Sequence, residues 1–285
     1  MICLTSDIHH CSLRTENQRH CAITELDTAQ RFLKILEERE IKVTFFISGK
    51  CFTEQWNDVR PLVEHPLVEV GGHNYACLTP TIYHRLWNKL TDNYNGPQWY
   101  QRRDALATKT IIHQRTGRRI RSWRNHMYMH GPHTEKILRA AGFTVCSDGV
   151  RKDSTGPEIH PTGLLNWPLN VMPDHEHLYH AERSPEWVEK WAARHGWSDD
   201  FGSRSYYIDE WVERVLQQLR DNEQRGVISN MLIHPITMYL CDGFSGFERI
   251  ADYLAERQTE QMGTLCDRAL SSVSELNEAD DYAFA

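Results

Sequence analysis

Short apolar runs alternate with helical patterns along most of the chain. Seven runs predict buried strands, over residues 2–7, 42–48, 67–73, 119–126, 143–147, 164–171 and 227–234. Between and after them, apolar residues recur at helical spacing over 24–40, 54–64, 98–116, 134–141, 185–195, 206–225 and 246–258. The run at 42–48, KVTFFIS, is apolar on both faces, as strands of a buried parallel sheet are.

Strands that alternate with helices predict a parallel sheet with helices outside it. Seven such units in 285 residues favour an α/β barrel of the incomplete or distorted (β/α)7 type. An open, doubly wound sheet is the alternative, because periodicity alone does not separate the two. We expect one domain over 1–285, with its core at about 2–260 and a C-terminal extension at 261–285. Thr24 and Asp27 resemble a capping box, which marks the start of the first helix.

Composition and charge narrow the class of protein. The chain is 40% hydrophobic and 25% charged, as ordinary globular domains are, and its formal net charge is −7. No basic patch is interleaved with aromatic residues, so nucleic acid is not an expected partner. No apolar run approaches the roughly 18 residues of a membrane span, and the first residues lack a signal-peptide pattern. The eight cysteines form no C-x-x-C pair and indicate reduced thiols, so we expect a cytoplasmic protein; its oligomeric state is not predicted.

Candidate functional side chains follow five of the seven predicted strands. In parallel α/β barrels the functional site forms at the C-terminal strand ends. The residues there are Asp7, His9 and His10; His73 and Cys77; Arg124 and His126; Asp148; and His234. Because residues two apart on an extended strand face the same side, Asp7 and His9 are expected to share the site, with His10 pointing away.

His73 and Cys77 are four residues apart, after two glycines that allow a close approach of the backbone. If the chain turns helically there, both side chains lie on one face and can chelate one cation. The simpler interpretation of Cys77 is a small buried hydrophobic residue.

These blocks resemble the polysaccharide deacetylases, the carbohydrate esterase family with the nodulation-protein-B homology domain, over about residues 2–260. LTSDIH at 4–9 is similar to the family's D-x-D block, which implies Asp7 as general base and His9 in the place of a metal ligand. GGHNYACLTP is similar to the H-[ST]-x-x-H block, with His73 as a metal ligand and Cys77 in the place of the second histidine.

Two further blocks support the resemblance. Arg124 matches the arginine of the family's R-x-P-Y block, which orients the base, but His126 stands where that block has proline. MLIHP is similar to the block whose histidine is the general acid, here His234. The altered ligands His9 and Cys77 are softer than the family's set, so with His73 they favour Zn²⁺. His126 can also enter the coordination sphere, and the alternative is a metal site that has decayed.

The resemblance implies a metal-dependent amidohydrolase that removes an acetyl or formyl group from the nitrogen of an amino sugar. A soluble or nucleotide-linked sugar in surface-polysaccharide biosynthesis, such as that of lipopolysaccharide, is the expected substrate. Two alternatives remain: hydrolysis of a non-sugar amide or ureide C–N bond, and a catalytically silent barrel that binds carbohydrate. Asp148, His175 and His177 are further candidates for the site. The two histidines follow the sixth strand and are expected in a polar substrate loop, with a second metal pair as the alternative.

Overall fold

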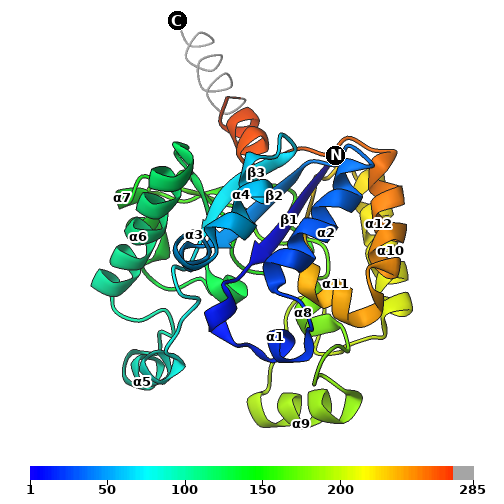
Figure 1. Cartoon of the computed structure of the whole chain (residues 1–285), viewed down its shortest axis with the longest axis horizontal. Coiled ribbons are helices and arrows are strands. Elements are labelled where there is room, and N and C mark those ends of the chain that lie inside the picture. The colour runs from blue at the N-terminus through cyan, green and yellow to red at the C-terminus, as the bar shows by residue number, and fades with distance from the viewer. Residues whose placement is uncertain (272–285) are drawn as a thin grey trace, which may run out of the picture.

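An eight-stranded sheet curls into an incomplete barrel at the centre of the computed structural model, which describes residues 1–271 (Figure 1). The strand order is β6-β7-β5-β4-β3-β2-β1-β8. The strands are β1 Ile2–Ile8, β2 Val43–Ser48, β3 Val68–His73, β4 Ser122–Arg124, β5 Val145–Cys146, β6 Glu158–Ile159, β7 Leu165–Asn166 and β8 Ser229–Leu232. Every pairing is parallel except that of β6 with β7. The predicted barrel of parallel strands is therefore confirmed.

Helices cover the outside of the sheet (Figure 1). They are α1 Glu16–His20, α2 Glu25–Glu37, α3 Gly49–Glu54, α4 Trp56–Glu64, α5 Thr81–Thr91, α6 Gln98–Thr116, α7 Thr134–Ala140, α8 Asp174–His177, α9 Pro185–His195, α10 Ile208–Gln224, α11 Pro235–Asp242 and α12 Ser245–Ala255. The predicted capping box of α2 is confirmed, because Thr24 and Asp27 bond to each other's backbone N–H. Among the described residues, no helix is both long and apolar enough to cross a membrane.

Side-chain amides close the barrel where the backbone ladder is missing. The Asn230 N–H on β8 donates to Asn170 Oδ1 (2.8 Å), and the Asn170 N–H donates to the Asn230 carbonyl (3.1 Å). Asn230 Nδ2 also donates to the Trp167 carbonyl at 2.9 Å. These bonds join β8 to the segment after β7, so they connect the two sides of the opening in the curled sheet.

The structure differs from the predicted elements at several places. β4 ends at Arg124, and residues 126–128 form a short 3-10 helix instead of continuing the strand. The helix expected at 54–64 is present as α4, and α3, which precedes it, was not predicted. β6 and the helices α1, α5, α8 and α11 were not predicted. The chain is helical over 262–271, where Met262 and Cys266 are buried against Cys3 and Phe46; the rest of the predicted extension, 272–285, lies outside the described residues.

Candidate metal and hydrolase site

Three imidazoles meet where β1, β3 and β4 end. The ring centroids of His9 and His73 are 5.2 Å apart, those of His9 and His126 are 5.1 Å apart, and those of His73 and His126 are 5.4 Å apart. One potential ligand atom from each, together with Cys77 Sγ, lies within 4.8 Å of all the others. The structure therefore brings together the three residues predicted as metal ligands and His126, which was predicted as a further candidate.

Two of these imidazoles have one nitrogen already occupied by an acceptor. His9 Nδ1 lies 2.7 Å from the Glu25 carboxylate, and His73 Nδ1 lies 2.8 Å from the Arg124 carbonyl. Because an oxygen acceptor takes the proton on Nδ1, Nε2 is the nitrogen of each ring that remains for a metal ion. This is the arrangement of metal-binding histidines, whose outer N–H is held by a carboxylate or carbonyl.

The third imidazole faces the second through nitrogen. His73 Nε2 and His126 Nδ1 are 3.3 Å apart. Burial, and then the charge of His9, lower the pKa of both His73 and His126 well below 6.5, so both rings are neutral. The lone pair of His73 Nε2 therefore needs either a proton from His126 or a shared cation. Neutral imidazoles with directed lone pairs are ligands suited to Zn²⁺, so the residues present fit such an ion.

Cys77 is a weaker ligand than the histidines. Its thiol is buried, and Sγ lies 3.7 Å from the Asn74 carbonyl. Burial, followed by the neighbouring Cys51 and Glu25, raises the pKa of Cys77 well above 9. A thiol binds zinc as thiolate, so Cys77 would ligate only if the ion itself displaced the proton. The helical turn considered for His73 and Cys77 is absent, because residues 75–78 form a turn in which Cys77 has φ 48°.

A buried ion pair lies beside the imidazoles. Arg124 Nη1 donates to Asp7 Oδ1 at 3.0 Å, and neither side chain is more than 2% exposed. Arg124 also donates to Thr5 Oγ1 on β1 and to the Ser147 carbonyl and hydroxyl after β5. The guanidinium therefore spans the barrel and fixes the Asp7 carboxylate, whose Oδ2 faces His234 Nε2 at 3.9 Å.

A second carboxylate binds His234 on the Nδ1 side of its ring. Asp174 accepts from His234 Nδ1 and from the His234 backbone N–H, both at 2.6 Å. Burial acts to lower the pKa of His234, but the charges of Asp174, Asp7 and Glu176 and the bond to Asp174 raise it to about 9. His234 is therefore protonated at neutral pH, with Nε2–H directed toward Asp7.

Sequence reasoning missed Asp174 and Glu25. Both are buried carboxylates at the start of helices, α8 and α2, where an acidic residue is ordinarily explained by the helix dipole. Their sequence signal is therefore ambiguous, and only the fold shows that each faces a histidine. Tyr128, which donates a hydrogen bond to Glu176, was also not singled out.

The other candidate residues have different surroundings. The His175 ring lies 5.7 Å from that of His234, within the site. His177 instead contacts the Arg204 carbonyl and Asp199. Asp148 accepts from Asn125 N (2.8 Å) and Nδ2 (2.6 Å) and thus holds the segment that presents His126.

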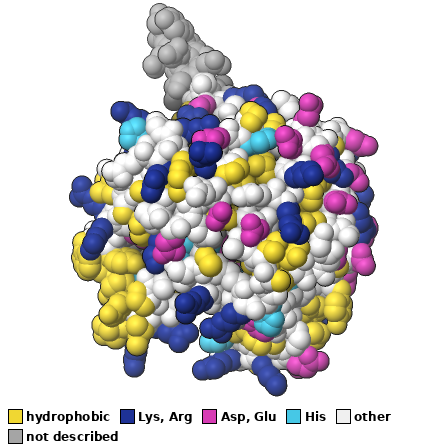
Figure 2. Space-filling view, viewed as in Figure 1, with side chains coloured by type: hydrophobic (Ala, Val, Ile, Leu, Met, Phe, Trp, Pro, Cys, Tyr) yellow, Lys and Arg dark blue, Asp and Glu magenta, His cyan; other side chains and the backbone are white. Residues whose placement is uncertain are grey.

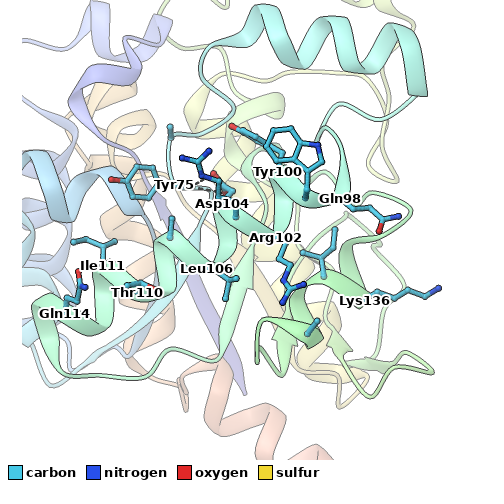
Figure 3. A pocket seen from close by; sticks show the side chains of 16 residues that line it. Tyr75, Gln98, Tyr100, Arg102, Asp104, Leu106, Thr110, Ile111, Gln114 and Lys136 are labelled. Atoms are coloured by element: carbon cyan, nitrogen blue, oxygen red, sulfur yellow. Dashed lines mark hydrogen bonds between the residues drawn. The ribbon is translucent and has the colours of Figure 1, made fainter.

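A large cavity lies outside this site. It is a groove of ≈ 1400 Å³ along α6, open to solvent, and Figure 3 shows Tyr75, Tyr100, Arg102 and Leu106 on its walls. Its lining includes none of the buried site residues described above. The grouping of ionisable side chains, and not cavity size, therefore locates the candidate site.

Glu25→Gln is expected to weaken zinc binding by about ten- to a hundredfold, because the amide cannot orient His9 as the carboxylate does. Glu64→Gln, at an exposed position of α4, is the matched control and should bind zinc as the unaltered chain does. Competition with a chromophoric chelator measures both affinities. Equal affinities for the two variants would contradict the role given to Glu25.

Comparisons with known proteins show a similar family sequence and a similar fold. Residues 23–146 match the family model of polysaccharide deacetylase, and the predicted resemblance is confirmed over that segment. No curated protein matches the chain in sequence.

Three solved structures share the fold at low identity. One from Mycobacterium smegmatis, described as a polysaccharide deacetylase, has a TM-score of 0.70 at 15% identity, over 95% of this chain and 90% of its own. The allantoinase PuuE has a TM-score of 0.62 at 12% identity, over 93% and 88%. A CE4 family pseudoenzyme from Bacillus anthracis has a TM-score of 0.52 at 14% identity, over 93% and 64%.

Proposed function

We propose that this protein is a zinc-dependent hydrolase that removes an N-acyl group, acetyl or formyl, from an amino sugar in surface-polysaccharide biosynthesis. The observation that carries the proposal is the convergence of His9, His73 and His126 beside two separately held groups, Asp7 with Arg124 and His234 with Asp174. The polysaccharide deacetylase match supports the reaction class.

The proposed ligands are His9 and His73 through Nε2 and His126 through Nδ1, with Cys77 as a further candidate. When bound, the ion supplies Lewis-acid activation of water and of the amide carbonyl. Asp148 and Asn125 would position His126 to hold the ion, and Glu25 would position His9.

The proton transfers fall to two side chains. Asp7 Oδ2, which is not bonded to Arg124, takes the proton of the water whose oxygen bonds to the acyl carbon. His234 Nε2–H gives its proton to the nitrogen as the C–N bond breaks, which releases the amine and the carboxylic acid. Asp174 keeps the His234 proton on the side of the leaving group, because it already accepts from Nδ1.

The test is acyl release by the zinc-loaded full chain. N-acetylated and N-formylated amino sugars, free and nucleotide-linked, are incubated with the chain, and acetate and formate are measured by NMR. Release that disappears in Asp7→Asn supports the proposal. Absence of release from every N-acylated sugar, with zinc bound, would contradict it.

Hydrolysis of a ureide C–N bond is the second candidate, because the allantoinase named above has the same fold. The same base and acid serve either bond. Allantoin and related ureides are therefore included in the assay, and turnover of these alone would favour this second candidate. A zinc-loaded chain that binds sugars and hydrolyses nothing would instead favour a silent barrel.

A further inference from the structure

The helix α5 turns an apolar stripe toward solvent. Ile82, Leu86 and Leu90 recur every four residues, which places them along one side of the helix, and Tyr83 lies next to them. These side chains are 69%, 51%, 70% and 56% exposed, in that order. The helix has one buried residue, His84, and projects from the body of the molecule (Figure 1).

Contacts of His84 fix which side of α5 faces outward. His84 Nδ1 lies 2.8 Å from the Tyr94 carbonyl, and Nε2 lies 3.3 Å from the Tyr100 hydroxyl. The Trp87 ring packs edge-on against His84 at 4.9 Å. Because these polar and aromatic contacts take the inner face, the aliphatic stripe is left on the outer one.

The apolar surface continues beyond α5. Trp99 is 62% exposed and Leu106 is 37% exposed; both line the groove along α6. Within the part of the chain that the structure describes, six of the ten exposed large hydrophobic side chains fall between residues 82 and 106. Figure 2 shows hydrophobic side chains gathered over α5 and α6, with Lys and Arg beside them. Such clustering marks an interaction surface.

The charge of this surface opposes that of the whole chain. Arg85, Lys89, Arg102 and Arg103 are exposed, and none of them forms an ion pair with a described residue. The acidic residues between 81 and 106 are Asp92 and Asp104, of which Asp104 is buried and bonded to Asn74. The segment is therefore basic, although the formal net charge of the protein is −7.

We propose that α5 and the start of α6 dock onto an anionic lipid surface. In the docked state, the stripe of Ile82, Leu86 and Leu90 enters the boundary between headgroups and acyl chains, as amphipathic helices with basic flanks do. The basic side chains stay at the level of the anionic headgroups. Exposed Tyr83 and Trp99 suit the same interface, because amphipathic aromatic rings concentrate there.

A lipid surface fits these observations better than a second copy of the chain. A twofold interface brings the same patch against itself, and it would place Arg85 and Lys89 close to their own counterparts. The resulting like-charge repulsion opposes such a dimer. The inference is independent of the proposed hydrolase activity.

Co-sedimentation of the full chain with vesicles tests the proposal. The chain is expected to pellet with phosphatidylglycerol-containing vesicles but not with phosphatidylcholine alone, and less as salt rises. Arg85→Ser or Lys89→Ser should each weaken binding about fivefold. Leu86→Glu combined with Leu90→Glu should lower the affinity for anionic vesicles at least about tenfold, because charge is placed in the apolar stripe. The matched control is Ile159→Glu with Tyr207→Glu, which adds the same charge at exposed apolar positions elsewhere and should bind as the unaltered chain does.

Three results would overturn the proposal. One is a chain that stays in the supernatant with anionic vesicles, which is the result expected if the surface binds an acidic protein instead of lipid. Another is equal loss of binding in the stripe variant and its control. The last is a concentration-dependent dimer in light scattering that the stripe variant abolishes. Circular dichroism, measured in every variant, reports whether the fold is intact.

Discussion

His73→Ala is expected to abolish both zinc binding and turnover. His73 is fully buried, its Nδ1 is held by the Arg124 carbonyl, and its Nε2 is aimed at the proposed ion position beside His126. Without it, the remaining histidines lose a ligand that no other described residue replaces. Because Lewis-acid activation contributes several kcal/mol, kcat/KM should fall by about a thousandfold or more. Metal analysis and acyl release measure the two effects.

The matched control is His113→Ala, on the outer surface of α6, which should retain zinc and activity. Circular dichroism establishes that both variants are folded. Turnover that survives in folded His73→Ala would rule out the proposed mechanism, whether or not zinc is still bound.

His234→Gln is expected to lower kcat by about a hundred- to ten-thousandfold while the zinc content is unchanged. Glutamine keeps a polar group of similar size but cannot deliver a proton to the leaving nitrogen. A variant with normal kcat would exclude His234 as the general acid.

The pH profile gives an independent readout of the same residue. His234 acts in its protonated form, so activity should fall as the pH rises through its pKa of about 9. The groups that face it are Asp174, Asp7, Glu176, His175 and His9. Asp174→Asn removes a charge that raises this pKa, so the alkaline limb should move to lower pH. If the alkaline limb of the pH profile stays at the same pH in Asp174→Asn, the pairing with Asp174 is not the cause of the raised His234 pKa.

Much of the fold was predictable because the sequence patterns that start, continue and end its helices and strands are local. α6 has its predicted bounds at Gln98–Thr116, and Gly117 follows it in the left-handed conformation that ends helices. The strand-end argument also predicted that Asp7, His73 and Arg124 lie close together, because parallel strands bring their C-terminal ends to one rim whatever their separation in sequence.

Residues whose role depends on a distant partner were not predictable. β4 stops at Arg124 because Asn125 is bonded to Asp148, and the His126 N–H donates to Asn74 Oδ1 at 2.6 Å. Neither bond has a local sequence signal. The same holds for Glu25, which is 16 residues from His9, and for Asp174, which is 60 residues from His234.

The most direct test of the central claim is the metal content of the full chain purified without chelator. We predict roughly one equivalent of zinc per chain, held at neutral pH and lost in His73→Ala. A folded chain that neither carries zinc nor takes it up when zinc is supplied would contradict the account. In that case His9, His73 and His126 would be a buried histidine cluster and not a metal site.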